Sequence, residues 1–273
     1  MEIICASICY RGWAEDEVEA TLRHAPAIGY RWMEVHGPLT WSLEAIQRFD
    51  LPGLQARIRA SGMRCAGLYT PGWGGKDEAD ALAHAQAIAR CAAFAEALGG
   101  DHITSTGASR RDEPGALARV ILCTREVLKT VPAHSPVKLA LEPHYGNVLE
   151  QPEDFEAVLT ACPDPRLGLC VDTGHFHSAG VDIPTFIHRF AARIVNVHLK
   201  DHLGHTSVGI GRGEIDLAAV ISALQEIGYA GGLTIELEVE DPQNLPRYTE
   251  EAYYYVSGML GQKLADGKPD WDL

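Results

Sequence analysis

The segment that decides the fold is LGLCVDTGHFH, residues 167–177, an apolar run that ends abruptly in polar, chemically capable side chains. Three other segments have the same form: LALEPH at 139–144, IVNVHLKD at 194–201 and LTIELE at 233–238. Near-continuous apolar runs of this length are typical of parallel strands that helices cover. Polar residues at their carboxyl ends are typical of the active-site edge of an α/β fold.

The rest of the chain alternates similar runs with segments of helical periodicity. Eight strands are predicted, at residues 3–9, 30–36, 64–70, 102–107, 138–144, 167–172, 194–200 and 233–238. Several helical segments stop at a glycine just before the next strand, and glycine readily closes a helix. Eight such units in 273 residues predict one α/β domain, 1–273, folded as a single (β/α)8 TIM barrel. The alternative, an open doubly wound sheet, is disfavoured because polar strand ends occur on at least four strands.

The amino-acid composition disfavours some classes of binding partner and indicates a cellular compartment. Asp and Glu total 37 against 23 Lys and Arg, a formal net charge of −14 that repels nucleic acid and anionic membranes. The seven cysteines form no CxxC pair and mostly lie in apolar runs, which favours a reduced, cytoplasmic protein. The amino terminus lacks the basic start of a signal peptide, and no apolar run approaches the roughly 18 residues of a membrane span. We therefore expect no nucleic acid and no membrane partner.

Four consecutive predicted strands carry a potential metal ligand at or near the carboxyl end: Glu142, Asp172, His198 and Glu236. Burying isolated carboxylates in a barrel mouth is costly, and a divalent cation offsets that cost. Three carboxylates and one imidazole form a mostly oxygen site that suits Mn²⁺ or Mg²⁺, with Co²⁺ or Zn²⁺ as alternatives. The sequence therefore predicts one divalent metal ion on these four residues.

Other polar residues are predicted to contact the substrate: His175, His144, Lys200, Glu34 and Arg212. His175 follows Asp172 on the loop, whereas His144 and Lys200 share strand parity with Glu142 and His198. Glu34, like His36, ends the second strand and is expected to line the mouth. The segment GIGRGEID, 209–216, has the spacing of a tight turn rather than of a dinucleotide loop, although its Arg212 could hold a substrate oxygen or phosphate.

In the order of these motifs, the sequence resembles the xylose isomerase-like TIM barrels of the sugar phosphate isomerase/epimerase superfamily. The matching segments are LEPHYGN at 141–147, VDTGH at 171–175, NVHLKD at 196–201, GRGEIDL at 211–217 and IELE at 235–238. The resemblance to ketose 3-epimerase-like members implies that Glu142, Asp172, His198 and Glu236 bind the metal and that Glu142 and Glu236 are the catalytic acid and base. It also implies that His175 contacts substrate near the metal and matches Arg212 to a substrate-binding arginine.

The HLKD and GxGxxD segments are more similar to hydroxypyruvate isomerase-like and inosose dehydratase-like members, so the outcome of the reaction stays open. Endonuclease IV-like members share the fold, but the extra histidines and the Asp-x-His of their three-metal cluster are missing here. DNA repair is therefore disfavoured, in agreement with the acidic net charge.

These features predict a divalent-metal-dependent isomerase or epimerase that acts on a small carbohydrate by proton transfer through an enediolate. A lyase of the inosose dehydratase type is the first alternative, because loss of a β-hydroxyl can follow the same deprotonation. A barrel that binds its ligand without turnover is the second. A homo-oligomer is also possible, since the aromatic cluster at 253–255 could face a subunit partner or pack the last helix onto the barrel.

Overall fold

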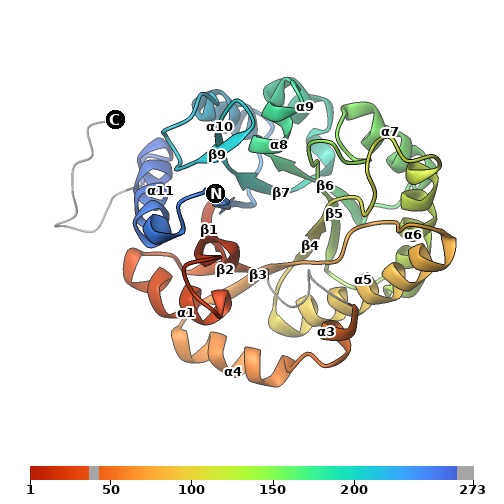
Figure 1. Cartoon of the computed structure of the whole chain (residues 1–273), viewed down its shortest axis with the longest axis horizontal. Helices are drawn as coiled ribbons and strands as arrows, with labels where there is room; N and C mark the ends of the chain where they lie inside the picture. Colours follow the sequence, from red (N-terminus) through yellow and green to blue (C-terminus); the bar gives the residue numbers. More distant parts are fainter. Residues whose placement is uncertain (37–42, 263–273) are drawn as a thin grey trace.

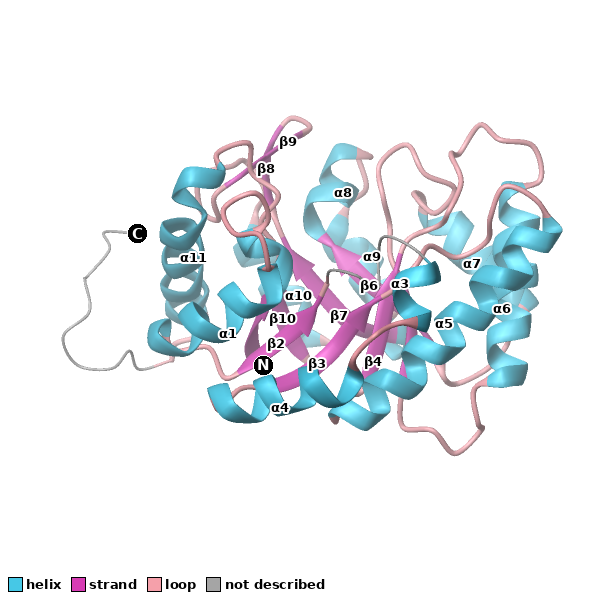
Figure 2. Cartoon of the chain, turned by 60° about the horizontal axis from the view of Figure 1, so that its bottom comes forward, coloured by secondary structure: helices cyan, strands magenta, loops and turns pink. Residues whose placement is uncertain are grey.

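The computed structural model describes residues 1–36 and 43–262, and its parallel strands form a closed barrel surrounded by helices (Figures 1 and 2). The strand order is β1-β10-β7-β6-β5-β4-β3-β2, with β1 pairing β2 to close the ring. The barrel strands are β1 (Glu2–Ala6), β2 (Trp32–Val35), β3 (Arg64–Tyr69), β4 (His102–Ser105), β5 (Lys138–Leu141), β6 (Leu167–Asp172), β7 (Ile194–Leu199) and β10 (Gly232–Ile235). The predicted (β/α)8 TIM barrel is therefore confirmed.

Helices follow the strands around the outside of the barrel. The α-helices are α1 (Glu17–Ile28), α3 (Leu43–Gln47), α4 (Leu51–Ser61), α5 (Glu78–Leu98), α6 (Ala116–Thr130), α7 (Pro152–Ala161), α8 (Thr173–Ser178), α9 (Ile183–Arg189), α10 (Leu217–Glu226) and α11 (Leu245–Met259). Helix α5 illustrates how the sequence sets their ends. The Asp77 side chain accepts a hydrogen bond from the backbone N–H of Asp80, and Gly99 closes the helix in the left-handed conformation that glycine tolerates.

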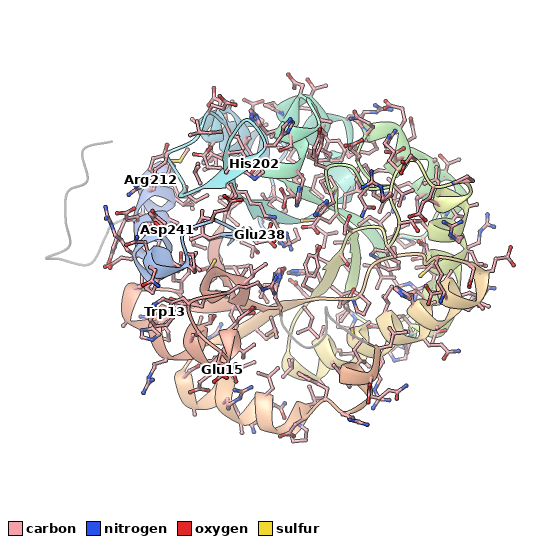
Figure 3. The ribbon with its side chains drawn as sticks, viewed as in Figure 1. Trp13, Glu15, His202, Arg212, Glu238 and Asp241 are labelled. Atoms are coloured by element: carbon pink, nitrogen blue, oxygen red, sulfur yellow. The ribbon has the colours of Figure 1, made fainter. Side chains whose placement is uncertain are left out.

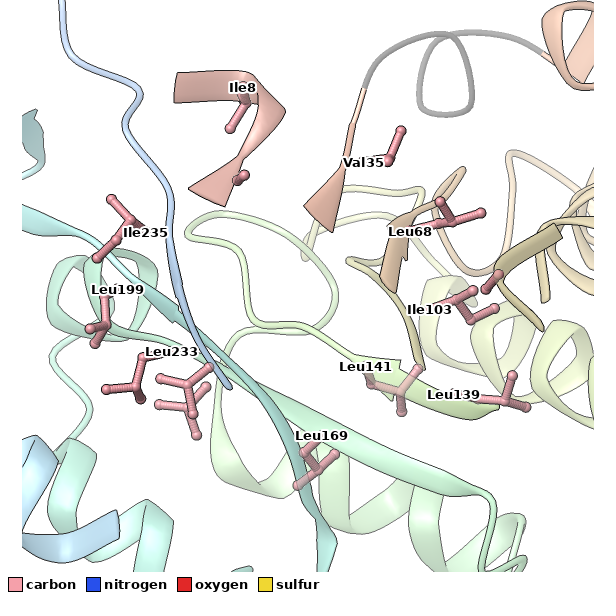
Figure 4. Packing of buried hydrophobic residues seen from close by; sticks show 14 of the residues in the cluster. Ile8, Val35, Leu68, Ile103, Leu139, Leu141, Leu169, Leu199, Leu233 and Ile235 are labelled. Carbon is pink, nitrogen blue, oxygen red and sulfur yellow. The ribbon is translucent and has the colours of Figure 1, made fainter. Parts of the chain in front are cut away.

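Alternate strand residues point outward and pack beneath the helices. Leu139, Leu169, Leu199 and Leu233 are buried in this layer (Figure 4). The opposite set points into the barrel, where polar side chains replace the branched apolar residues that usually fill such an interior. Glu34, His102 and Asn196 are among these interior residues.

Several strand ladders end before the predicted strand ends. The strands predicted at 138–144 and 233–238 stop at Leu141 and Ile235. The next residue in each case keeps one bond to its neighbour: Glu142 N–H donates to the Ser105 carbonyl, and Glu236 N–H donates to the Leu199 carbonyl. These bonds fix both glutamates at the carboxyl edge of the barrel.

The sequence did not predict the small antiparallel hairpin that follows β7, made of β8 (Asp201–Leu203) and β9 (Thr206–Val208). It projects beyond the carboxyl end of the barrel (Figure 2). Buried Asp201 anchors the turn after it, because its carboxylate accepts hydrogen bonds from the backbone N–H groups of Gly211 and Gly213 at 2.9 and 2.8 Å. The glycine-rich segment is thus a turn organised around a carboxylate of its own chain.

This anchoring predicts a stability effect for Asp201→Asn. The amide keeps the shape of the carboxylate but removes its charge, and its own N–H group then faces backbone N–H groups that need an acceptor. The free energy of unfolding should therefore fall by about 2–3 kcal/mol. Urea unfolding of the variant measures the loss. Asp182→Asn is the matched control, because Asp182 is an N-cap that accepts from Thr185 N–H, and asparagine caps helices equally well. Equal stabilities of the two variants would contradict this account of the turn.

Three other features bear on the sequence predictions. All seven cysteines are free and buried. In the described part of the chain, none of the helices combines the length and apolar character needed to cross a membrane. Tyr253 packs α11 onto the barrel, since its hydroxyl donates to the Gly29 carbonyl at 3.2 Å and its ring centroid lies 4.7 Å from that of Tyr30. Oligomerisation stays a prediction.

Candidate metal centre and active site

Four side chains from four strands meet at the carboxyl end of the barrel. They are Glu142, Asp172, His198 and Glu236, here called the metal-binding group, and one ligand atom from each lies within 4.8 Å of the others. All four are buried. His198 Nδ1 lies 2.5 Å from Glu142 Oε1 and 2.9 Å from Glu236 Oε2. The structure thus brings together the four residues that the sequence analysis singled out as ligands.

Two buried carboxylate oxygens test whether this group fits a cation. Asp172 Oδ2 and Glu236 Oε2 accept no well-formed hydrogen bond, although the Lys200 ammonium lies near both. Burial raises the pKa of Asp172 to about 7, with Lys200 acting in the opposite direction and Glu236 reinforcing the rise. Unsatisfied buried carboxylate oxygens are costly, and a divalent cation would satisfy them together with the imidazole. The donor set therefore fits one divalent ion, held by hard oxygen ligands and one nitrogen.

A buried lysine lies beside the metal-binding group. Lys200 Nζ is 3.2 Å from Asp172 Oδ2, 3.3 Å from Glu236 Oε2 and 2.5 Å from Glu238 Oε2. Burial lowers the pKa of Lys200, but these carboxylates outweigh that effect and hold the pKa well above its ordinary value. Figure 3 shows Glu238 toward the centre of the barrel. The sequence analysis missed Glu238, although its parity with Glu236 in IELE was an available signal.

Two histidines continue the site beyond Lys200. Asp172 caps α8 by accepting the His175 N–H at 2.8 Å, which holds this histidine beside the metal-binding group. His175 Nε2 lies 3.3 Å from Lys200 Nζ, and the ring centroids of His175 and His144 are 3.8 Å apart. Burial and then Lys200 hold the pKa of His175 well below its ordinary value, so this imidazole is neutral at physiological pH. A neutral imidazole can both donate to and accept from a substrate hydroxyl.

Tyr69, the last residue of β3, is a further residue of the site. Its hydroxyl donates to Glu142 Oε2 at 2.5 Å, and its ring stacks on His36 at a centroid distance of 4.6 Å. Burial and the neighbouring Glu142 hold the pKa of Tyr69 well above its ordinary value, so the phenol keeps its proton. Its position at the end of the third predicted strand was the only sequence signal.

Glu34 does not lie at the mouth, where the sequence analysis placed it. It is fully buried behind His198, with Oε1 2.9 Å from His198 Nε2 and 3.0 Å from His36 Nε2. Burial opposes its ionisation, but His198 and His102 hold the pKa of Glu34 well below its ordinary value. Glu34 thus faces the nitrogen of His198 that points away from the metal-binding group, and its contact with substrate stays a prediction.

Arg212 also lies apart from the metal-binding group. Its side chain is 45% exposed, its Nη2 lies 2.5 Å from Glu251 Oε2, and its guanidinium stands 5.0 Å above the Tyr248 ring. Figure 3 shows it at the outer edge of the molecule, beside α11. Because the bonds to Asp201 set the course of the turn, the predicted contact between Arg212 and substrate is not supported by this arrangement.

Comparisons with known proteins can be set beside this geometry. A rhizopine catabolism protein, MocC, from Rhizobium meliloti is 28% identical over 86% of this chain and 81% of its own length. An inosose dehydratase from Lacticaseibacillus casei is 28% identical over 43% of this chain and 46% of its own length. The chain thus matches about half the length of that dehydratase.

Solved structures with the same fold are less similar in sequence. L-ribulose 3-epimerase superposes with a TM-score of 0.77 at 22% identity, over 98% of this chain and 100% of the other. The IOLI protein with a bound zinc atom superposes with a TM-score of 0.79 at 18% identity, over 96% and 98% of the two chains. The model of the xylose isomerase-like TIM barrel family matches residues 22–255. With its closed barrel and this match over most of its length, the chain belongs to the xylose isomerase-like TIM barrel family.

Proposed function

We propose that this protein is a divalent-metal-dependent isomerase or epimerase, which moves a proton at the carbon next to a carbonyl of a small carbohydrate. The single observation that carries the proposal is the convergence of three carboxylates and one imidazole within 4.8 Å at the active-site edge of the barrel. Glu142, Asp172, His198 and Glu236 would hold the ion. When bound, the cation polarises the substrate carbonyl and stabilises the negative charge that develops on its oxygen.

Two glutamates are positioned for the proton transfers. Glu142 and Glu236 directly follow β5 and β10, on either side of His198, so they can serve as base and acid on different sides of a substrate. Tyr69 donates to Glu142 Oε2 and so orients that carboxylate. Return of the proton to the opposite face gives an epimer, and return to the adjacent carbon gives an isomer.

The other polar groups suit a polyhydroxylated substrate. Lys200 supplies a fixed positive charge, and His175 and His144 supply hydrogen bonds beside it. A buried ammonium next to a developing oxyanion adds to the electrostatic stabilisation of the transition state. We propose that these three residues bind the carbonyl and hydroxyl groups of the sugar.

The second candidate is dehydration, in which the proton is removed at the same carbon but a β-hydroxyl leaves as water. The 28% identity to an inosose dehydratase over part of the chain favours it. The identity of the ion is likewise a proposal: Mn²⁺ and Mg²⁺ suit the oxygen-rich set, and the zinc atom in the IOLI structure adds Zn²⁺.

The test is a screen of ketoses, inososes and 3-keto sugars in D₂O with added Mn²⁺ or Zn²⁺, followed by NMR. We expect deuterium to enter the position next to the carbonyl for at least one substrate class. A change of stereochemistry or carbonyl position without change of composition identifies an epimerase or isomerase, whereas loss of water with an enone-type product identifies a dehydratase. No exchange with any of these substrates, in protein shown to bind the ion, would contradict the proposal.

A further inference from the structure

A chain of polar side chains runs through the barrel interior behind the metal-binding group. It consists of Asp101, His102 and Glu34 and is here called the interior column. Branched apolar side chains usually fill the inside of such a barrel, and buried polar groups are stable only when they are hydrogen-bonded. A hydrogen-bonded chain of polar side chains in this position therefore indicates a functional role.

The contacts of the column connect the opposite end of the barrel to the ligand His198. Asp101 Oδ1 lies 2.7 Å from His102 Nδ1, His102 Nε2 lies 2.9 Å from Glu34 Oε2, and Glu34 Oε1 lies 2.9 Å from His198 Nε2. The Asp101 side chain is 83% exposed, whereas Glu34 and His198 are both at 0%. The column thus begins in solvent at the amino-terminal end of β4 and ends at a buried imidazole.

The last contact determines which nitrogen of His198 is left for the cation. Ionised Glu34 only accepts hydrogen bonds, so His198 carries a proton on Nε2. Without a cation Nδ1 also faces carboxylates, those of Glu142 and Glu236, and carries a proton too; a bound cation would replace that proton. Histidine ligands of metals characteristically donate their second N–H to a carboxylate, which fixes the tautomer and the ring orientation.

The neighbouring strands are built to hold this arrangement. A Cβ atom at Gly67, which pairs with His102 across β3 and β4, would lie 2.3 Å from His102 Nε2. Asn196 Nδ2 donates to Glu34 Oε2 at 2.7 Å and to Thr104 Oγ1 at 3.0 Å. The glycine makes room for the histidine ring, and the asparagine gives Glu34 a further donor.

The protonation state of His102 matches its two carboxylate partners. Burial lowers the pKa of its imidazole, but hydrogen bonds to Asp101 and Glu34 raise it to about 9 overall. At neutral pH the ring therefore has two N–H groups, one for each carboxylate. One carboxylate oxygen of Glu34 thus accepts a hydrogen bond from His102, and the other oxygen faces His198.

We propose that Asp101, His102 and Glu34 are positioning residues, which fix the tautomer and orientation of His198 and thereby set the affinity of the metal-binding group for a divalent ion. This inference rests on the metal site of the proposed function. It extends the site to a surface carboxylate at the opposite end of the barrel, which would influence the metal without touching it.

The experiment compares His102→Phe with His102→Gln and Asp101→Asn in the full-length chain. Phenylalanine keeps a planar ring but donates nothing, whereas the glutamine amide can still donate to Glu34. Titration with Zn²⁺ and Mn²⁺ should show a loss of affinity of about 10–100-fold for His102→Phe and a smaller loss for His102→Gln. In protein loaded with Zn²⁺, the ¹⁵N shifts of His198 should show Nε2–H, with Nδ1 as the ligand atom, in the wild type and a mixture of the two tautomers in His102→Phe.

Two glycine variants separate the column from general packing damage. Gly67→Ala pushes a Cβ against His102, and Gly168→Ala pushes one to 2.1 Å from Val195 Cγ2, a side chain that is not part of the column. Both should lose stability, but only Gly67→Ala should change the His198 tautomer and the metal affinity. Asp101→Asn still tests the column if the interior variants fail to fold, because Asp101 is at the surface. This variant should weaken metal binding less than His102→Phe does.

The outcomes distinguish this inference from the proposed function. Wild-type protein that binds no divalent ion would overturn both the proposed function and the affinity claim. Wild-type protein that binds the ion, together with folded His102→Phe of unchanged affinity and unchanged His198 tautomer, would overturn the column alone. Reduced affinity with an altered tautomer, in His102→Phe and Gly67→Ala but not in Gly168→Ala, supports it.

Discussion

The Glu236→Gln variant is expected to lose about 10³-fold or more of the rate of deuterium exchange into substrate, while its fold remains intact. Glutamine has the shape of glutamate but cannot take up a proton, and general acid–base groups contribute roughly 10²–10⁴-fold to such rates. Glu236 follows β10 and keeps its backbone bond to the Leu199 carbonyl, so the side chain stays in place. Glu142→Gln should behave in the same way, because Glu142 is the other member of the acid–base pair.

The measurement is NMR of the exchanging position at saturating metal, since both glutamates are also ligands and the variants will bind the ion more weakly. Glu240→Gln is the matched control, because Glu240 is exposed and lies only four residues away. It should exchange at the wild-type rate. Wild-type exchange in metal-saturated Glu142→Gln and Glu236→Gln would contradict the assignment of these residues as acid and base.

Lys200→Met is expected to destabilise the metal-free protein by about 3–5 kcal/mol, the usual consequence of removing one partner from a buried ion pair. Lys200 is 2% exposed and lies within 3.3 Å of Asp172 and Glu236, which are buried, so its loss leaves these two carboxylates without a positive partner. Methionine fills a similar volume without charge. Addition of Mn²⁺ or Zn²⁺ should restore stability, because the cation supplies the missing positive charge.

Thermal unfolding with and without metal tests this expectation. The increase in melting temperature on adding metal should be larger for Lys200→Met than for the wild type, and metal affinity should rise while turnover falls. Lys138→Met is the control, because Lys138 is an exposed lysine at the start of β5. An unchanged melting temperature of metal-free Lys200→Met, or weaker metal binding by that variant, would refute the electrostatic role of Lys200.

The barrel was predictable because its strands are short apolar runs that alternate with helical periods, a pattern that depends on local sequence. All eight barrel strands lie where such runs were found, although most ladders are shorter than predicted. Glu142 and Glu236 ended up just after the ladders, because a single backbone bond, rather than a full ladder, holds each of them. Strand parity and the common carboxyl edge were enough to anticipate that Glu142, Asp172, His198 and Glu236 would meet.

Depth along the barrel axis and the direction of a loop could not be predicted from the sequence. Glu34 shares the parity of His36, but parity does not give height along the barrel axis, and the stagger of the strands places Glu34 behind His198. Arg212 lies in a turn whose course is set by buried Asp201, a contact within a chain segment that has no periodicity. His102 lies at the amino-terminal start of β4, the end of the barrel opposite the metal-binding group, yet it is connected to that group through Glu34.

The most direct test of the central claim is the metal content of the protein after equilibrium dialysis against Mn²⁺ or Zn²⁺, measured by elemental analysis. The account predicts about one ion per chain for the wild type and close to none for a double variant, Asp172→Asn with His198→Asn, that removes two of four ligands. Circular dichroism should show the double variant folded. Wild-type protein without bound metal, or a double variant that still binds one ion per chain, would contradict the claim that these residues form the metal centre.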